Sequence, residues 1–111
     1  MFQIDQTNIN IKSPPYMISE IGLNHNGDIK EAIRLIDDSR DSGCNAVKFQ
    51  LRSEAFFLRD IHTMEIGQQY VFEYIKETYL NFKEYEILFE YAKSIEMDLL
   101  VSCWDIESLL F

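Results

Sequence analysis

Residues 18–28 read ISEIGLNHNGD, and this stretch decides the fold of the chain. It begins with the alternating apolar and polar residues of a β-strand and then becomes a polar turn with two glycines. A helical pattern follows directly at Ile29. In α/β proteins such strand-to-helix corners lie at the carboxyl ends of strands, where ligands bind. Because the polar side chains of this corner have no obvious packing purpose, we expect some of them to be functional.

The size and composition limit what the chain can be. It has 111 residues, enough for one domain at most, with 47% apolar and 26% charged residues as in globular proteins. It has no apolar run of membrane-spanning length and no signal peptide at its start, so a cytoplasmic location is expected. The net charge of −9 argues against nucleic acid or an anionic membrane as a partner. Cys44 and Cys103 form no CxxC motif, so we expect free, buried thiols rather than a zinc or redox site.

Strand and helix patterns alternate along the chain after a leader that can form a short β-hairpin in residues 1–15. Asp28 is a good helix N-cap, and Gly43 suits the end of the same helix. The alternation predicts an α/β fold with a parallel sheet and right-handed crossovers. The expected strands are residues 16–21, 44–51 and 98–103, and the expected helices are residues 29–41, 70–80, 83–95 and a last one from 106, capped by Asp105.

The two faces of the strands differ in chemistry. In the second strand Val47, Phe49 and Leu51 share the face expected to lie under helices, while Lys48 and its neighbours Ala46 and Gln50 share the other. A lysine in a strand usually lies at an edge or extends to solvent, but a parallel strand is normally buried on both faces. We therefore expect Lys48 to be buried with an anionic partner. Glu20 in the first strand is either a solvated strand-end charge or a functional group.

The remaining segments give weaker expectations. Leu99, Leu100 and Val101 predict a fully buried run in the third strand, in which Leu100, Ser102 and Trp104 share a face. Residues 52–69 predict a loop that is longer than most strand-to-helix loops, as at a functional end of the molecule. We interpret His62 in this loop as a solvated residue. We interpret the aromatic residues of 83–95 as core-facing.

Three motifs together resemble the sialic acid synthase family. Residues 19–27, SEIGLNHNG, are similar to its AE-x-G-x-NHNG signature, and residues 46–50, AVKFQ, to its second-strand motif. The separation of Glu20 and Lys48, 48 − 20 = 28 residues, also matches. Residues 101–105, VSCWD, resemble the third-strand STPFD segment loosely, because only Asp105 is kept.

The resemblance implies a (β/α)₈ barrel followed by a small antifreeze-like domain, with residues 1–111 forming the first three βα units of the barrel. Enzymes of this family condense phosphoenolpyruvate with an N-acetylated hexosamine, such as N-acetylmannosamine, to a nonulosonic acid and phosphate. The resemblance also implies a homodimer and a divalent metal, Mn²⁺ or Mg²⁺, held by histidines of later strands. No metal ligand is assigned in this chain, and we expect His25 to organise its corner by hydrogen bonds.

Site roles follow from the same resemblance. Lys48 would hold the phosphoenolpyruvate anion, and Glu20 would act in acid–base chemistry or orient the sugar. Ser102, in the place of threonine, would donate its hydroxyl to the phosphate. Gln50 and Asn24 would line the pocket.

The length raises alternatives. A closed barrel needs about 250 residues, so the chain is expected to be the N-terminal part of a longer enzyme or a truncated gene product that is inactive alone. A second reading is a small non-catalytic α/β binding module that retains a degenerate phosphate corner, which the altered residues 101–104 favour. A third is an aldolase-like barrel that uses Lys48 to form a Schiff base.

Overall fold

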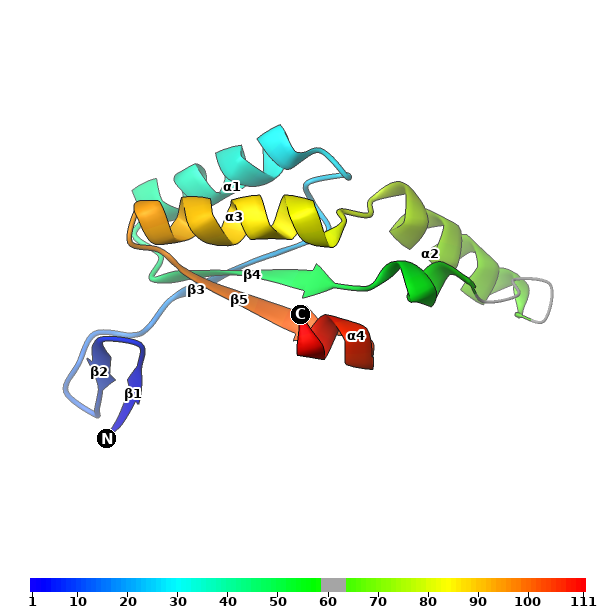
Figure 1. Ribbon diagram of the computed structural model, residues 1–111. Helices are drawn as coiled ribbons and strands as arrows, with labels where there is room; N and C mark the ends of the chain where they lie inside the picture. Colours follow the sequence, from blue (N-terminus) through cyan, green and yellow to red (C-terminus); the bar gives the residue numbers. More distant parts are fainter. Residues whose placement is uncertain (59–63) are drawn as a thin grey trace.

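The central sheet has three parallel strands. The computed structural model describes residues 1–58 and 64–111. Within them the strand order is β3 (Ile18–Gly22), β4 (Ala46–Leu51) and β5 (Asp98–Cys103). Two helices, α1 (Ile29–Asp41) and α3 (Phe82–Ser94), lie side by side over one face of this sheet (Figure 1). The predicted α/β fold with parallel strands is thereby confirmed.

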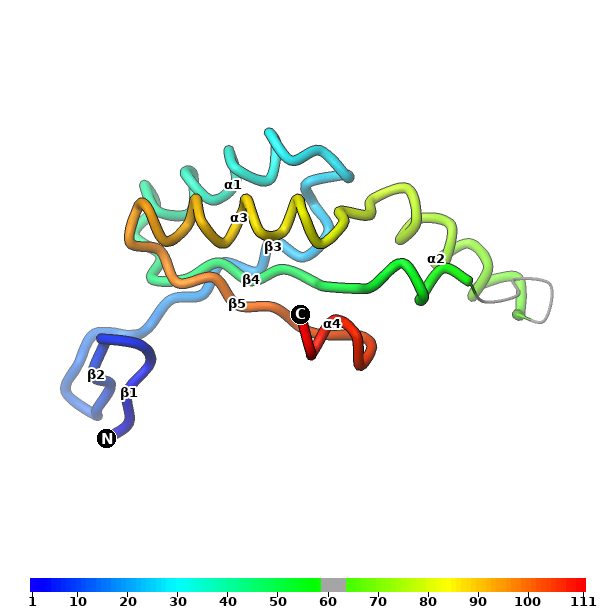
Figure 2. The backbone as a smooth tube through the Cα atoms, viewed as in Figure 1, coloured from blue at the N-terminus to red at the C-terminus, as the bar shows by residue number. Residues whose placement is uncertain are grey.

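The other elements extend the molecule at both ends of the sheet. The hairpin predicted in the leader is present as β1 (Phe2–Ile4) and β2 (Thr7–Ile9), which pair antiparallel. Past the carboxyl ends of the strands lie a 3₁₀ helix (Glu54–Leu58), α2 (Ile66–Glu77) and α4 (Ile106–Leu110). The chain is therefore elongated, with extents of 52 × 29 × 25 Å (Figure 2).

The prediction of a continuous loop over residues 52–69 is wrong. The 3₁₀ helix occupies its first part, and α2 starts at Ile66 rather than at residue 70. The start of α2 carries a capping box between Glu65 and Gln68, a pairing that lacks the usual serine, threonine, aspartate or asparagine at the N-cap. His62 lies outside the described residues.

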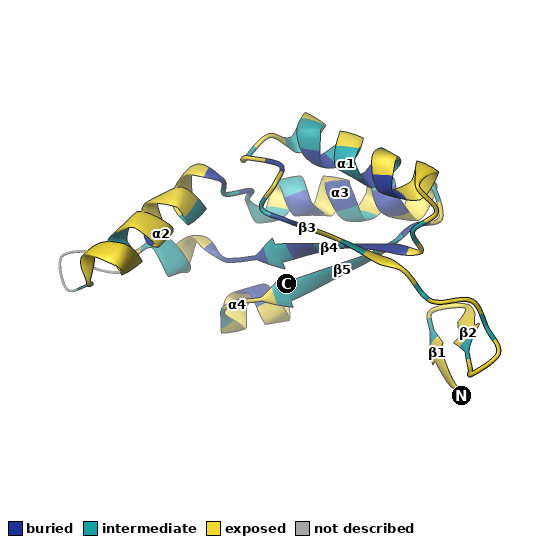
Figure 3. Cartoon of the chain, turned by 180° about the vertical axis from the view of Figure 1, so that it is seen from behind, coloured by how far each residue is buried: buried dark blue, intermediate teal, exposed yellow. Residues whose placement is uncertain are grey.

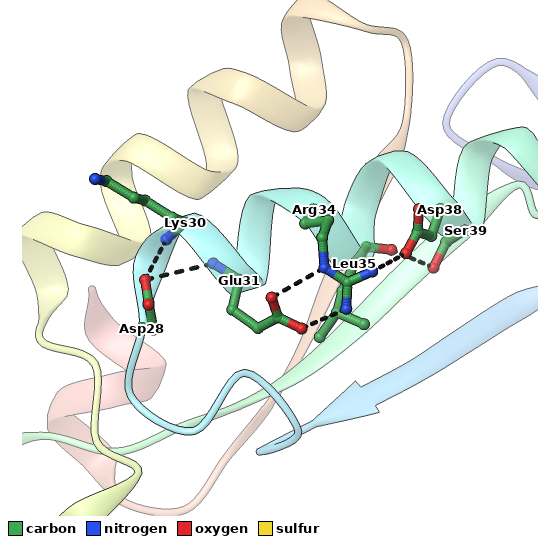
Figure 4. A network of polar contacts seen from close by, with 7 residues as sticks. All are labelled: Asp28, Lys30, Glu31, Arg34, Leu35, Asp38 and Ser39. Atoms are coloured by element: carbon green, nitrogen blue, oxygen red, sulfur yellow. Dashed lines mark hydrogen bonds and ion pairs between the residues drawn. The ribbon is translucent and has the colours of Figure 1, made fainter.

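Local interactions fix both ends of α1. The Asp28 carboxylate accepts hydrogen bonds from the backbone N–H groups of Lys30, at 2.8 Å, and Glu31, at 3.4 Å (Figure 4). Gly43 follows the helix with a φ of +87°, the left-handed conformation that favours glycine. On the exposed side Arg34 forms ion pairs with Glu31 and with Asp38 (Figure 4). The boundaries predicted for this helix are confirmed.

The core lies between the sheet and the two helices. Val47, Phe49 and Leu51 of β4 are at most 1% exposed and pack with Ile36 of α1 and Leu88 of α3. Burying each such side chain stabilises the fold by roughly 1.5–3 kcal/mol. The apolar face predicted for the second strand therefore lies under helices, as expected.

The prediction of a fully buried run in the third strand is wrong. Residues 99–101 of β5 are only partly buried, and Cys103 at its end is exposed (Figure 3). The physical reason is that β5 is an edge of the described sheet, and no described helix covers the face opposite α1 and α3. Among the helices of residues 1–58 and 64–111, none is both long and apolar enough to cross a membrane.

Candidate active site

Glu20 and Lys48 form an ion pair on the sheet face that points away from the helices. The parallel register of β3 and β4 places the two residues side by side, and Lys48 Nζ lies 2.5 Å from Glu20 Oε2. Glu20 is thus the anionic partner predicted for Lys48. The expectation that Lys48 is buried is wrong for the described residues, because its side chain is 35% exposed on the uncovered face.

A cavity of about 390 Å³ opens beside this ion pair, at the carboxyl ends of the strands. The register of β4 and β5 pairs Gln50 with Ser102, so both residues lie on the same face as Lys48. All five residues predicted for the site meet at this cavity. Its lining consists of Glu20, Gly22, Leu23, Asn24, Lys48, Gln50, Tyr74, Ser102 and Trp104.

The corner after β3 is shaped by a β-bulge. Glu20 pairs with Lys48 while Gly22 pairs with Phe49, so Ile21 is one extra residue in β3. Gly22 has a φ of +58°, which favours glycine. Glu20 lies on the cavity face and Ile21 in the core, as alternation along the strand requires, and the bulge brings Gly22 opposite Phe49.

Asn24 uses its side chain both in the corner and in the cavity. Its Nδ2 donates a hydrogen bond to the backbone carbonyl oxygen of Ile21 at 2.8 Å. The amide can then offer its Oδ1 oxygen to a ligand as an acceptor. The structure therefore assigns a turn-forming contact to this residue in addition to its place on the lining.

His25 is buried in the corner, as the sequence predicts for a structural histidine. It is 0% exposed, its Nδ1 accepts a hydrogen bond from the Gly27 N–H at 3.1 Å, and its ring contacts Phe49. Burial lowers the pKa of His25 to about 4, which keeps the imidazole neutral. A neutral ring fits a corner that must be packed against the core.

Two aromatic residues at the cavity were not predicted as site residues. Trp104 follows β5 and is 54% exposed, and Tyr74 comes from the otherwise separate helix α2. The alternation that places Trp104 on the face of Ser102 was a usable signal for the first. Tyr74 had no such signal, because its position depends on how α2 folds back over the strand ends.

Arg52 is a buried cation directly behind the cavity. It is 4% exposed, and its guanidinium carbon lies 4.5 Å from the Trp104 ring centroid and 5.2 Å from that of Phe56. Its Nη2 donates to Gln50 Oε1 at 3.2 Å, while its Nε has no hydrogen-bond partner among the described residues. Burial lowers the pKa of Arg52. Arg52 falls in the loop predicted for residues 52–69, and the sequence carried no signal for its burial.

Asp105, the residue kept from the third-strand motif, ties β4 to α4. Its carboxylate accepts from the backbone N–H groups of Ser108, at 2.7 Å, and Ser53, at 2.8 Å, and from the Ser108 hydroxyl. Burial alone would raise the pKa of this carboxyl, but these hydrogen bonds lower it below its usual value. The residue therefore holds the segment after β4 against the segment after β5.

No metal site is formed by the part of the chain that the structure describes. Its residues contain no group of three or more histidine, cysteine, aspartate or glutamate side chains that could hold a metal ion. Glu20 is paired with Lys48, and the His25 ring is enclosed in the core. Residues 1–58 and 64–111 thus do not fit the divalent metal that the resemblance implies.

A larger cavity, of about 880 Å³, lies at the opposite end of the sheet, beside the turn between β1 and β2. Its charged lining mixes the cations Arg40 and Lys93 with acidic residues that include Asp5, Glu90 and Asp98. Ligands of parallel α/β folds bind at the carboxyl ends of strands, and this cavity lies at the amino ends. We therefore place the candidate site at the smaller cavity.

The parallel βα units define an α/β protein, and the cavity with a paired lysine and glutamate at the carboxyl ends of its strands is the candidate ligand site. The structure superimposes on N-acetylneuraminic acid (sialic acid) synthetase from Leptospira borgpetersenii serovar Hardjo-bovis, solved in complex with citrate. The TM-score is 0.79 at 26% identity, over 98% of this chain and 36% of that chain.

The sequence profile of the NeuB family matches residues 35–111, and the chain belongs to this family. It is 27% identical to N,N'-diacetyllegionaminic acid synthase from Legionella pneumophila over 103 residues, which is 86% of this chain and 29% of the relative. It is 30% identical to N-acetylneuraminate-9-phosphate synthase from Drosophila melanogaster over 106 residues, 86% of this chain and 27% of the relative. The chain thus spans less than a third of the length of the curated relatives it matches.

Proposed function

We propose that this chain supplies the anion-binding strand ends of a sugar acid synthase that condenses phosphoenolpyruvate with an N-acetylated hexosamine of the N-acetylmannosamine type. The products would be a nonulosonic acid and phosphate. The observation that carries the proposal is the Glu20–Lys48 ion pair, which shares one cavity with Gln50 and Ser102 at the carboxyl edge of the sheet.

The donors of the cavity suit phosphoenolpyruvate. This substrate carries a carboxylate and a phosphate, and the Lys48 ammonium is a compact cation on a rigid strand. Gln50 and Ser102 lie side by side one pleat further along and add an amide and a hydroxyl donor. Each hydrogen bond to a charged group contributes roughly 1.5–3 kcal/mol. The three donors therefore form a local anion site in a chain of net charge −9.

The acceptors of the cavity suit the sugar. Carbon–carbon bond formation at the open-chain aldehyde leaves an alkoxide, which must be stabilised and protonated. An ionised carboxylate only accepts hydrogen bonds, so in this form Glu20 is suited to orient sugar hydroxyls, whereas in its protonated form it would donate the proton that the alkoxide needs. Asn24 Oδ1 adds a second acceptor. We assign the implied metal to no residue of this chain and derive no step through it.

The Schiff-base alternative is less favoured by the geometry. Lysines that form Schiff bases react as neutral amines and are typically desolvated or beside another cation. Lys48 is 35% exposed and lies beside a carboxylate. The non-catalytic module differs from the synthase proposal in predicting no Lys48-dependent binding of phosphoenolpyruvate. The two can therefore be separated by a binding experiment.

Phosphoenolpyruvate titration of the ¹⁵N-labelled chain tests the proposal. We expect amide shifts at Lys48, Gln50 and Ser102, and their loss in Lys48→Ala. Lys93→Ala is the matched control, because this lysine lines the cavity at the other end of the sheet. Shifts that persist in Lys48→Ala, or that are absent from the cavity of the unsubstituted chain, would refute the proposal.

The same proposal places residues 1–111 as the first three βα units of a barrel in a longer, homodimeric protein with an antifreeze-like domain. An open cavity with only these strands leaves the substrates in contact with water. We therefore expect no phosphate release when the 111-residue chain alone is incubated with phosphoenolpyruvate and N-acetylmannosamine. Release at a rate above that of Lys48→Ala would show that the chain is catalytically complete.

A further inference from the structure

We propose that Arg52 is a positioning residue for the cavity: it fixes the Gln50 side chain so that the amide N–H groups, and not the carbonyl oxygen, face the ligand. This role extends the function proposed above and in part rests on it. Arg52 itself does not line the cavity, so it would act through Gln50 and Trp104.

The orientation of the Gln50 amide follows from the chemistry of arginine. A guanidinium has only donors, so the amide atom that faces Arg52 Nη2 at 3.2 Å must be the oxygen. If the Gln50 amide were flipped, its NH₂ group would face the Arg52 N–H, so that two donors would meet beside a guanidinium that is 4% exposed. The Nε2 group is thereby directed away from Arg52, to the side of the strand end where Gly22 lies. A Cβ atom on Gly22 would be 3.7 Å from it.

The backbone of Gln50 is held as firmly as its side chain. The hydroxyl of Tyr85, a residue that is 1% exposed, donates to the Gln50 carbonyl oxygen at 2.8 Å. The backbone N–H of Trp104 donates to the next carbonyl, that of Leu51, at 3.1 Å. The residue therefore has little freedom except rotation of its amide, and Arg52 removes that freedom.

The consequence is a cavity with a set polarity. Lys48, Gln50 and Ser102 each present a donor, while Glu20 is the acceptor across the ion pair. Without Arg52 the Gln50 amide could present its oxygen, which would repel an anion. The inferred role is thus to select an anionic group at this point of the cavity.

Trp104 adds a second effect of the same guanidinium. Its ring centroid lies 4.5 Å from the Arg52 guanidinium carbon, a distance typical of cation–π contacts. An indole held in this way forms a fixed wall at the mouth of the cavity although it is 54% exposed. We expect its mobility to increase when the guanidinium is removed.

The orientation can be tested without a ligand. In the ¹⁵N-labelled chain we expect nuclear Overhauser contacts from the Gln50 side-chain NH₂ to the Gly22 α protons. We expect Arg52→Met, which keeps an unbranched apolar stem, to lose these contacts, and Arg52→Lys, which keeps a donor, to retain part of them. Unchanged contacts in Arg52→Met would overturn the inference.

A double-mutant cycle with phosphoenolpyruvate tests the coupling. We expect Arg52→Met and Gln50→Met each to weaken binding about 2- to 10-fold, the range of one hydrogen bond. We expect the double variant to bind no more weakly than Gln50→Met alone. A purely structural role for Arg52 would instead weaken binding by the same factor in both backgrounds, which would overturn the inference.

Gln50→Glu guards against variants that fail to fold. The new carboxylate would pair with the Arg52 guanidinium, so we expect the midpoint of urea unfolding to stay or rise while phosphoenolpyruvate binding falls more than in Gln50→Met. Retained binding in Gln50→Glu would contradict the assigned donor role. If the unsubstituted chain binds no phosphoenolpyruvate, the proposed function fails, and the Overhauser contacts alone decide the role of Arg52.

Discussion

Gly27→Ala tests how the corner after β3 is packed. Gly27 has a φ of +74°, and a Cβ atom at this position would lie 2.9 Å from the backbone carbonyl oxygen of Glu77 at the end of α2. The left-handed conformation costs a residue with a side chain about 1–2 kcal/mol. Forcing an extra methyl group into a packed site costs roughly 1–3 kcal/mol more, because the contacted atom is backbone. We therefore expect a loss of about 2–5 kcal/mol in the free energy of unfolding.

Gly43→Ala is the matched control for this prediction. Gly43 has a similar φ of +87°, but a Cβ atom there would have no neighbour within 4 Å. It should lose only the conformational part, about 1–2 kcal/mol. Urea unfolding followed by far-ultraviolet circular dichroism measures both losses. Equal losses in the two variants would refute the close contact between the corner and α2.

Three further predictions concern the groups that support the site. Because burial lowers the pKa of His25 to about 4 from its usual 6.5, the neutral ring should contribute its full stability above pH 6.5. Between pH 6.5 and pH 4 the free energy of unfolding should fall by about 1.4 kcal/mol per pH unit, because the unfolded chain binds a proton that the folded one does not. Urea unfolding at several pH values should show a weaker pH dependence of this free energy in His25→Asn. Tyr85→Phe should lower the free energy of unfolding by about 1–3 kcal/mol, since it leaves the Gln50 carbonyl of β4 without the Tyr85 donor. Tyr91→Phe, which removes a hydroxyl that donates to the Asp37 side chain, is the comparison, and chemical unfolding should show a smaller loss for it. Asp105→Ala should lower the free energy of unfolding by about 0.5–2 kcal/mol, because it removes the cap of α4. Asp105→Asn keeps a capping side chain, so a thermal unfolding midpoint of Asp105→Ala that is no lower than that of Asp105→Asn would contradict this role.

The order of the elements could be predicted because their local signals agree. Asp28 and Gly43 marked the ends of α1, and the alternation around Lys48 separated the core face of β4 from the cavity face. The parallel arrangement then followed from the alternation of strands and helices. The meeting of Glu20, Lys48 and Ser102 at one cavity was predictable for the same reason, since all three stand near carboxyl ends of neighbouring strands.

The errors have a common physical origin in contacts between distant segments. The exposure of β5 depends on which strand neighbours it, and the burial of Arg52 depends on where the Trp104 and Phe56 rings lie. Neither relation leaves a periodic trace in the sequence. Tyr74 lines the cavity because the carboxyl end of α2 lies against the corner after β3, where Gly27 is close to the backbone of Glu77. The local sequence pattern therefore predicted the site residues on the strands, but not the aromatic residues at the cavity opening.

The bulge between Glu20 and Gly22 has a consequence for how the gene can vary. One residue fewer in this segment would restore an unbroken ladder. Because Gly22 already pairs with Phe49, such a deletion would keep this register but would remove Ile21, which packs in the core. A codon inserted or deleted there would therefore change the spacing between the Glu20 carboxylate and the turn that follows it.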